Sequence, residues 1–215
     1  MIVEKHVVES YLFDALREEL EEEGFEQILE LGQWRKNIRA GFHSIIVSIS
    51  PYPDVCVVEF HLGVRITDIE QLTHAAMHNP IDYQANSHTL MISHGRLMNK
   101  AHHRFQVAGI DHLDDLANDF RDFWAEVGRS FFTGHETLSA VAHTLNRQPL
   151  SACAALHNQA HRCIKGIAAA WLTRAKNYEA LVQIYDTQLA NLPNGIKHRP
   201  RFQQLAALLG DISPN

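Results

Sequence analysis

Three side chains of the kinds that bind zinc recur at four-residue intervals in the second half of the sequence. In the segment CAALHNQAHRC, Cys153, His157 and His161 are each four residues apart, and Cys163 follows closely. Residues at this spacing on a helix lie on neighbouring turns of one face, so a thiolate and two imidazoles can converge on one metal ion. We therefore name Cys153, His157 and His161 as candidate metal ligands.

The helical angles of this segment favour a simpler interpretation. With about 100° per residue, the apolar positions form one continuous stripe, which comprises Cys153, Leu156, Ala160, Cys163, Ile164, Ile167 and Trp171. His157 falls at the edge of the stripe, and His161 lies roughly 115° from its centre, toward solvent. Core cysteines with flanking histidines are thus the favoured interpretation, a zinc site is the alternative, and we expect no bound cofactor.

Histidine is abundant, with 15 residues in the chain. Pairs at helical spacing, such as His74 and His78, or adjacent ones, such as His102 and His103, therefore arise by chance. A metal-dependent hydrolase remains an alternative function, with candidate residues His61, His94, His157 and His161. A pH-responsive binding protein is a further alternative, because imidazole changes its charge near pH 6.5, and it would change its assembly between about pH 7.5 and 5.5.

The sequence lacks three motifs that usually indicate an enzyme. It has no G-x-S-x-G nucleophile elbow, no G-x-x-x-x-G-K phosphate loop and no G-x-G-x-x-G dinucleotide motif. Catalytic residues, if any, are not identified by spacing. The leading hypothesis is therefore a noncatalytic protein-binding or interaction module with a protein partner, and its expected site is the groove between the sheet domain and the helical tail.

Composition narrows the class of protein. Hydrophobic residues make up 46% and charged residues 20% of the chain, as in globular domains. No apolar run is long enough for a membrane helix, and the net charge of -6 disfavours a nucleic-acid partner. The N-terminus lacks the basic start of a secretory signal, and Cys56, Cys153 and Cys163 do not form a disulfide pattern. We expect a cytoplasmic protein without membrane contact.

The first half of the sequence predicts one helix followed by an antiparallel sheet. The spacing of Leu12, Leu16 and Leu20 predicts a helix over 9–23. Alternation of apolar and polar residues then predicts a meander with strands at 34–39, 42–50, 55–64, 88–94 and 103–107, interrupted by a helix at 68–78. The sheet needs the N-terminal helix to cover its apolar face.

The second half is helical throughout. Helices are predicted at 111–128, 135–146, 150–174, 178–192 and 201–209, and Gly166 is expected to bend or split the longest of them. Residues 168–189 are typical of a tetratricopeptide-like helical hairpin. The fold class is α+β, with an N-terminal helix packed on an antiparallel meander in residues 1–130 and a helical extension in residues 131–215.

Several short segments together resemble a known family. The order of YLFDALREELEEEGFEQ, WRKNI, FHSIIVSIS, VEFHLGV and HRFQV is similar to that in domain of unknown function 4304, a group of uncharacterised bacterial proteins. The similarity covers roughly residues 8–130, and a helical tail extends it to residue 190. The resemblance implies no catalytic residues. It implies a small bacterial protein, and an immunity-like role beside a toxin is the function we expect from it.

Overall fold

The computed structural model describes residues 3–100 and 102–211, which form two compact units. The first unit is built from the described residues of 1–64 and 91–134, and the second from those of 65–90 and 135–215. The chain therefore leaves the first unit within a strand, passes through the second, returns, and crosses again after Gly134. The predicted boundary at residue 130 lies near that last crossing, whereas the grouping of 65–90 with the C-terminal helices was not predicted.

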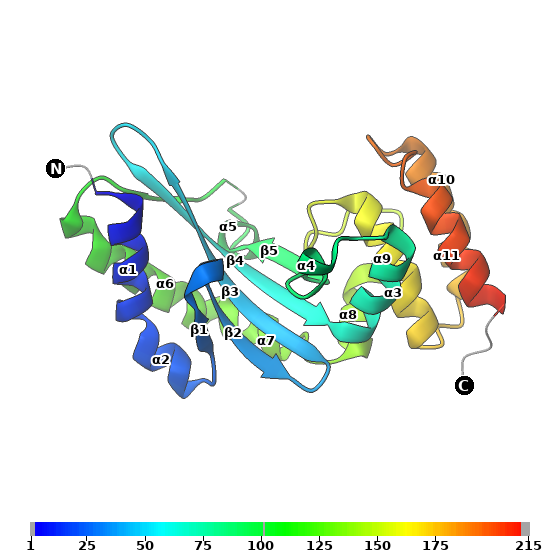
Figure 1. Ribbon diagram of the computed structural model, residues 1–215, viewed down its shortest axis with the longest axis horizontal. Helices are drawn as coiled ribbons and strands as arrows, with labels where there is room; N and C mark the ends of the chain where they lie inside the picture. Colours follow the sequence, from blue (N-terminus) through cyan, green and yellow to red (C-terminus); the bar gives the residue numbers. More distant parts are fainter. Residues whose placement is uncertain (1–2, 101, 212–215) are drawn as a thin grey trace. The chain divides into compact units, whose positions relative to one another are not determined.

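The first unit contains an antiparallel sheet in which neighbouring strands follow the chain order (Figure 1). The strands are β1 (Glu26–Ile28), β2 (Gln33–Ile38), β3 (Gly41–Pro51), β4 (Cys56–Ile66) and β5 (Leu90–Ser93). A further strand, β6 (Phe105–Val107), pairs with the beginning of β4, where Cys56 lies opposite Val107. The predicted meander is thus confirmed, and β1 is a strand that the prediction missed.

Helices cover the sheet of the first unit. They are α1 (Lys5–Ala15), α2 (Arg17–Glu22), α5 (His94–Leu97), α6 (Leu113–Phe123) and α7 (Arg129–Thr133), with 3-10 turns at Leu29–Leu31 and Ile110–His112 and a π-helical turn at Trp124–Gly128. Phe13 of α1 stacks on Trp34 of β2 with ring centroids 4.0 Å apart. Phe120 of α6 contacts Phe60 of β4. The single helix predicted over 9–23 is two helices in the structure, because the helix is interrupted at Leu16.

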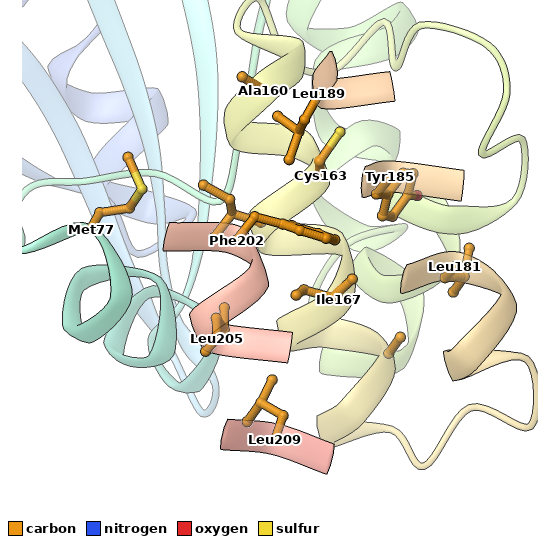
Figure 2. Packing of buried hydrophobic residues seen from close by; sticks show 12 residues of the cluster. Met77, Ala160, Cys163, Ile167, Leu181, Tyr185, Leu189, Phe202, Leu205 and Leu209 are labelled. Atoms are coloured by element: carbon orange, nitrogen blue, oxygen red, sulfur yellow. The ribbon is translucent and has the colours of Figure 1, made fainter. Parts of the chain in front are cut away.

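The second unit is helical. Its elements are α3 (Thr67–Met77), α4 (Ile81–Gln84), α8 (Leu138–Asn146), α9 (Gln159–Leu172), α10 (Tyr178–Asn191) and α11 (Arg199–Asp211). The α9 helix is central and contacts α3, α8, α10 and α11. Figure 2 shows its inner face, where Cys163 and Ile167 meet Tyr185, Leu189 and Phe202 in one hydrophobic core.

The α9 helix differs from the prediction in two ways. It begins at Gln159 rather than near Leu150, because Asn158 caps it by accepting hydrogen bonds from the main-chain amides of Ala160 and His161. It also runs unbroken through Gly166, which was expected to bend or split it. A Cβ atom at Gly166 would lie 2.7 Å from Cε2 of Tyr185, so this glycine permits close packing of α10 on α9.

The predicted α+β class is confirmed, with an N-terminal helix on an antiparallel sheet and a helical C-terminal part. Within residues 3–100 and 102–211, none of the helices combines the length and apolar character that crossing a bilayer requires.

Candidate functional site

A pocket of about 490 Å³ opens within the second unit. One wall is a single face of α10, made of Gln183, Ile184, Thr187, Gln188, Asn191 and Leu192. The facing wall is formed by the loop before α9 and the first turn of that helix, through Leu150, Ser151, Ala152, Gln159 and Arg162. Its size is in the range of pockets that hold small ligands or a few residues of a peptide.

The wall on α10 presents two rows of side chains. Gln183, Thr187 and Asn191 follow one another at intervals of four residues and are exposed. The neighbouring row at the same interval includes Ile184 and Leu192, which are half-buried. Since a helix rises about 1.5 Å per residue, each row is about 12 Å long. The wall therefore combines hydrogen-bonding groups with an apolar strip, to which the exposed Leu150 adds from the other side.

Arg162 contributes a buried cation to this pocket. Its side chain is only 2% exposed, and its guanidinium stacks over the ring of Tyr185 at 4.8 Å. Nε donates to the carbonyl of Leu145 at 2.9 Å, and Nη2 donates to that of Gln148 at 3.0 Å. Nη1 donates to the carbonyls of Pro149 and Ser151 at 3.1 and 3.2 Å. The guanidinium thus fixes the loop that forms the pocket wall.

The charge of Arg162 is not matched by an acid in the described part of the chain. Its remaining contact there is the amide oxygen of Gln188, 3.5 Å from Nη1. All its hydrogen-bond acceptors there are neutral oxygens, whose dipoles bind the N–H groups that they contact but leave one full positive charge. A buried charge without a counter-charge is costly for a protein to retain. A pocket lined by such a cation is suited to an anionic group.

Amide side chains hold the loop in place. The Gln159 side chain accepts from the main-chain amide of Cys153 at 2.9 Å and donates to the carbonyl of Leu156 at 2.6 Å. Gln188 donates from Nε2 to the carbonyl of Pro149 at 2.5 Å, which ties α10 to the loop. Residues 148–156 are therefore positioned by side chains of α9 and α10, although they contain no regular element.

The pocket lining contains hydrogen-bonding groups but no general base. None of its side chains is an Asp, Glu, His, Lys, Cys or Tyr, which are the residues that usually transfer protons in enzymes. A guanidinium has no free lone pair to accept a proton, so Arg162 does not serve as a base. Ser151 and Thr187 have no base among the lining residues to activate them. The lining thus offers hydrogen-bonding and apolar groups to a ligand.

The predicted metal ligands do not share one helix. Cys153 and His157 precede α9, and only His161 lies on it. The Cys153 thiol is buried and lies 3.7 Å from the carbonyl of Thr144, whereas His157 is exposed. The ring of His161 meets that of His198 edge-on, with centroids 5.3 Å apart. Burial raises the pKa of the nearby Cys163 thiol to about 12.

Among residues 3–100 and 102–211, no three His, Cys, Asp or Glu side chains are grouped so that they could hold a metal ion. Metal binding at Cys153, His157 and His161 remains a prediction that this geometry does not strengthen, since the four-residue spacing no longer places the three side chains on successive helical turns.

The candidate enzyme histidines of the first unit lie on β4 and at the start of α5. His94 is fully buried, and its Nε2 atom lies 3.1 Å from Nδ1 of His103. Burial lowers the pKa of His94 to about 4, so the imidazole is neutral at pH 7. Nε2 of His61 lies 3.7 Å from the Glu59 carboxylate. Phe60 and Phe105 pack against the His94 ring, which makes it part of the core.

A second polar cluster in the second unit joins α3 to α9. Nζ of Lys165 lies 2.9 Å from Oε1 of Glu70 and donates to the carbonyl of His88 at 2.5 Å. His74 Nε2 lies 2.8 Å from the hydroxyl of Ser87, which is the spacing of a nucleophile and its base. Glu70 and Lys165 are 0% and 4% exposed. Sequence reasoning found only His74 of this group.

This second cluster is closed to substrate. Ser87 is buried, and its hydroxyl also accepts a hydrogen bond from Nη1 of Arg65 at 2.6 Å. Such a bond draws electron density from the oxygen and weakens it as a nucleophile. The Lys165 ammonium holds the pKa of Glu70 below its usual value despite the opposing effect of burial. The charges of Glu70 and Lys165 compensate each other, so we interpret the cluster as structural.

The pocket residues were missed in the sequence because their roles depend on the loop before α9. One signal was present: residues 163–172 are apolar around most of the helix circumference, which is typical of a helix buried on all sides. A cation on such a helix is buried too, and this applies to both Arg162 and Lys165.

No protein-family model matches the chain, and no curated protein or solved structure shows significant similarity to it. The resemblance to domain of unknown function 4304 therefore remains a prediction from short motifs.

Proposed function

We propose that this protein is a noncatalytic binding module that recognises a protein partner through the pocket beside α10. The observation that supports it most is the lining, which offers amides, hydroxyls and an apolar strip around one uncompensated cation and contains no proton-transfer group. Hydrophobic contact surrounded by hydrogen-bonding groups is the usual arrangement at protein interfaces. The sequence resemblance adds a toxin as the class of partner, so an immunity-like role is part of the proposal.

Site-specific photo-crosslinking in the native host tests this proposal. The pair Leu150 and Leu208 is well matched, because both leucines are strongly exposed, at 79% and 54%, and only Leu150 lines the pocket. A benzophenone amino acid placed at position 150 is expected to give a discrete protein adduct on irradiation, and the same residue at position 208 is expected to give none.

Equal adducts at both positions would show nonspecific contact and contradict the proposal, as would the absence of any adduct at position 150. Replacing Ile184 by Asp in the Leu150 crosslinking variant should remove the adduct, since a charge on the apolar strip opposes burial of a partner side chain. Mass spectrometry of the adduct identifies the partner and shows directly whether it is a toxin.

A further inference from the structure

The chemistry of the pocket also restricts which part of a partner enters it. Arg162 carries a full positive charge, is 2% exposed and lines the pocket. Of the described residues, Gln148 alone accepts from its Nη2 group, which carries two N–H groups. The second N–H of this group therefore has no acceptor among the described residues. A charge-assisted hydrogen bond from a guanidinium to a carboxylate is stronger than one to a neutral acceptor.

The apolar strip lies in the same pocket as this cation. Ile184 and Leu192 on α10 and Leu150 on the loop all line it. An occupant must therefore present an anionic group and an apolar group close together. In an Asp or Glu residue the carboxylate ends the side chain, and the apolar neighbour is at least one residue away. At the end of a chain, the α-carboxylate and the last side chain leave the same Cα atom.

The exposed row on α10 suits the residues that precede such a chain end. Gln183, Thr187 and Asn191 offer amide and hydroxyl groups along about 12 Å of the pocket rim. Main-chain N–H and C=O groups of an extended peptide pair with side chains of these kinds without regard to the peptide's sequence. The exposed row on α10 thus suits the backbone of a bound peptide, and the part of the pocket around Arg162 and the apolar strip suits the end of its chain.

We propose that the pocket captures the C-terminal residue of a partner protein, with its α-carboxylate directed to Arg162 and an apolar last side chain on Ile184, Leu192 and Leu150. This inference rests on the proposed function and adds the identity of the bound segment. It assigns Arg162 two tasks, since the same guanidinium that fixes the loop through carbonyl groups also recognises the ligand.

NMR titration of the full chain tests the proposal with defined probes. The first probe is a pool of synthetic decapeptides with mixed interior positions and a C-terminal leucine as the free acid. The second is the same pool with the terminus amidated, and the third is 4-methylpentanoic acid, which offers the carboxylate and the branched alkyl group without a peptide. Methyl signals of Leu150, Ile184 and Leu192 report binding.

The free-acid pool is expected to shift these methyl signals, and the amidated pool is expected to bind about tenfold more weakly or worse, as loss of a charge-assisted hydrogen bond implies. Equal binding of both pools would overturn the proposal, and so would no binding of either. If 4-methylpentanoic acid binds as tightly as the peptide acids, the pocket recognises a small acid and the proposal of a chain terminus is wrong.

Variants on the rim avoid disturbing the structural role of Arg162. Thr187 is exposed, and among the described residues its hydroxyl donates to the carbonyl of Gln183 on the same helix. Thr187→Glu is expected to weaken binding of the free-acid pool about tenfold, and Thr187→Lys is expected to maintain or strengthen it. Ala190→Glu adds the same charge on an exposed part of α10 outside the pocket lining and should leave binding unchanged.

The experiments distinguish failure of the proposed binding function from failure of the proposed C-terminus recognition. If crosslinking at position 150 captures a partner but free-acid and amidated peptides bind alike, the terminus proposal is wrong and the binding function stands. If Thr187→Glu and Ala190→Glu weaken binding equally, the effect is a general loss of charge complementarity, which also contradicts recognition in the pocket.

Discussion

Two cations three residues apart on α9 are buried to nearly the same extent but have different surroundings. Lys165 is 4% exposed and lies 2.9 Å from the Glu70 carboxylate. Arg162 is 2% exposed, and its hydrogen-bond acceptors in the described part of the chain are all neutral oxygens. One charge is balanced within a closed cluster, and the other is unbalanced at the wall of an open pocket.

The difference shows that burial of a charge does not by itself indicate a functional site. A compensated pair such as Glu70 and Lys165 joins two helices and specifies how they pack, although its net contribution to stability can be small. An uncompensated cation has electrostatic free energy that a ligand can lower. Lys165 therefore belongs to the structure of the second unit, and the proposed binding role falls to Arg162.

The largest effect on stability is expected from removing one partner of the buried ion pair between Glu70 and Lys165. Glu70→Ala leaves the Lys165 ammonium buried without its counter-charge and is expected to lower the free energy of unfolding by about 3–5 kcal/mol. Urea denaturation measures this change. Replacing both residues, as Glu70→Leu with Lys165→Met, should recover most of the loss. A change below about 1 kcal/mol for Glu70→Ala would show that the pair is not closed to water.

A smaller effect is expected where α10 packs on α9. Gly166→Ala places a methyl group 2.7 Å from Tyr185 and Asn146 and is expected to destabilise the fold by about 1–3 kcal/mol. The matched control is Gly210→Ala on α11, where a Cβ atom meets nothing within 4 Å. There the change should be neutral or stabilising by up to about 1 kcal/mol. Thermal denaturation of both variants decides whether Gly166 provides close packing.

Acid should weaken the second unit through His161. Burial and the nearby Lys165 lower the pKa of His161 to about 4, whereas an unfolded histidine titrates near 6.5. The unfolded state therefore binds the proton first, so stability present above about pH 6.5 is lost as the pH falls toward 4. The slope is at most about 1.4 kcal/mol per pH unit. His161→Gln should flatten the profile measured by urea denaturation at each pH.

The same pKa values bear on the pH-responsive alternative. Loss of hydration lowers the pKa of both His94, which is buried, and His161, which is half-buried, to about 4 in the folded protein. These two imidazoles stay largely uncharged between about pH 7.5 and 5.5, where an imidazole sensor is expected to act. A reversible change of assembly in that window, measured by sedimentation, would have to come from other histidines of the chain.

The smallest effect on stability is expected at the rim of the pocket. Thr187→Glu changes an exposed side chain and should alter the free energy of unfolding by no more than about 0.5 kcal/mol. The variant is expected to weaken peptide binding without changing stability. A large loss of stability in this variant would mean that the rim is part of the core, which would contradict the assignment of this face to a ligand.

The sheet could be predicted from sequence because its signal is local. Ile45, Val47 and Ile49 share one face of their segment, and Ser44, Ser48 and Ser50 lie on the other. The same period of two continues through Val58, Phe60 and Leu62. These positions became β3 and β4. The edge strand β1 was missed since three residues are too few to show a period. The break at Leu16 was missed because apolar spacing continues across it.

The grouping of the chain into units could not be read from local patterns. Residues 65–90 join the C-terminal helices through contacts far apart in sequence, such as the ion pair of Glu70 with Lys165 and the bond from Lys165 to His88. The pocket has the same origin, since Arg162 acts through carbonyl groups of an irregular loop. Side-chain type and spacing carry no signal for such main-chain contacts.

Side-chain NMR of the two α9 cations tests the contrast between them most directly. With the free-acid peptide pool added, the Nε–H signal of Arg162 is expected to shift and the Nζ signal of Lys165 is expected to stay in place. A complex that forms while the Arg162 signal is unchanged, or one that shifts the Lys165 signal instead, would contradict the account of an open and a closed charge on one helix.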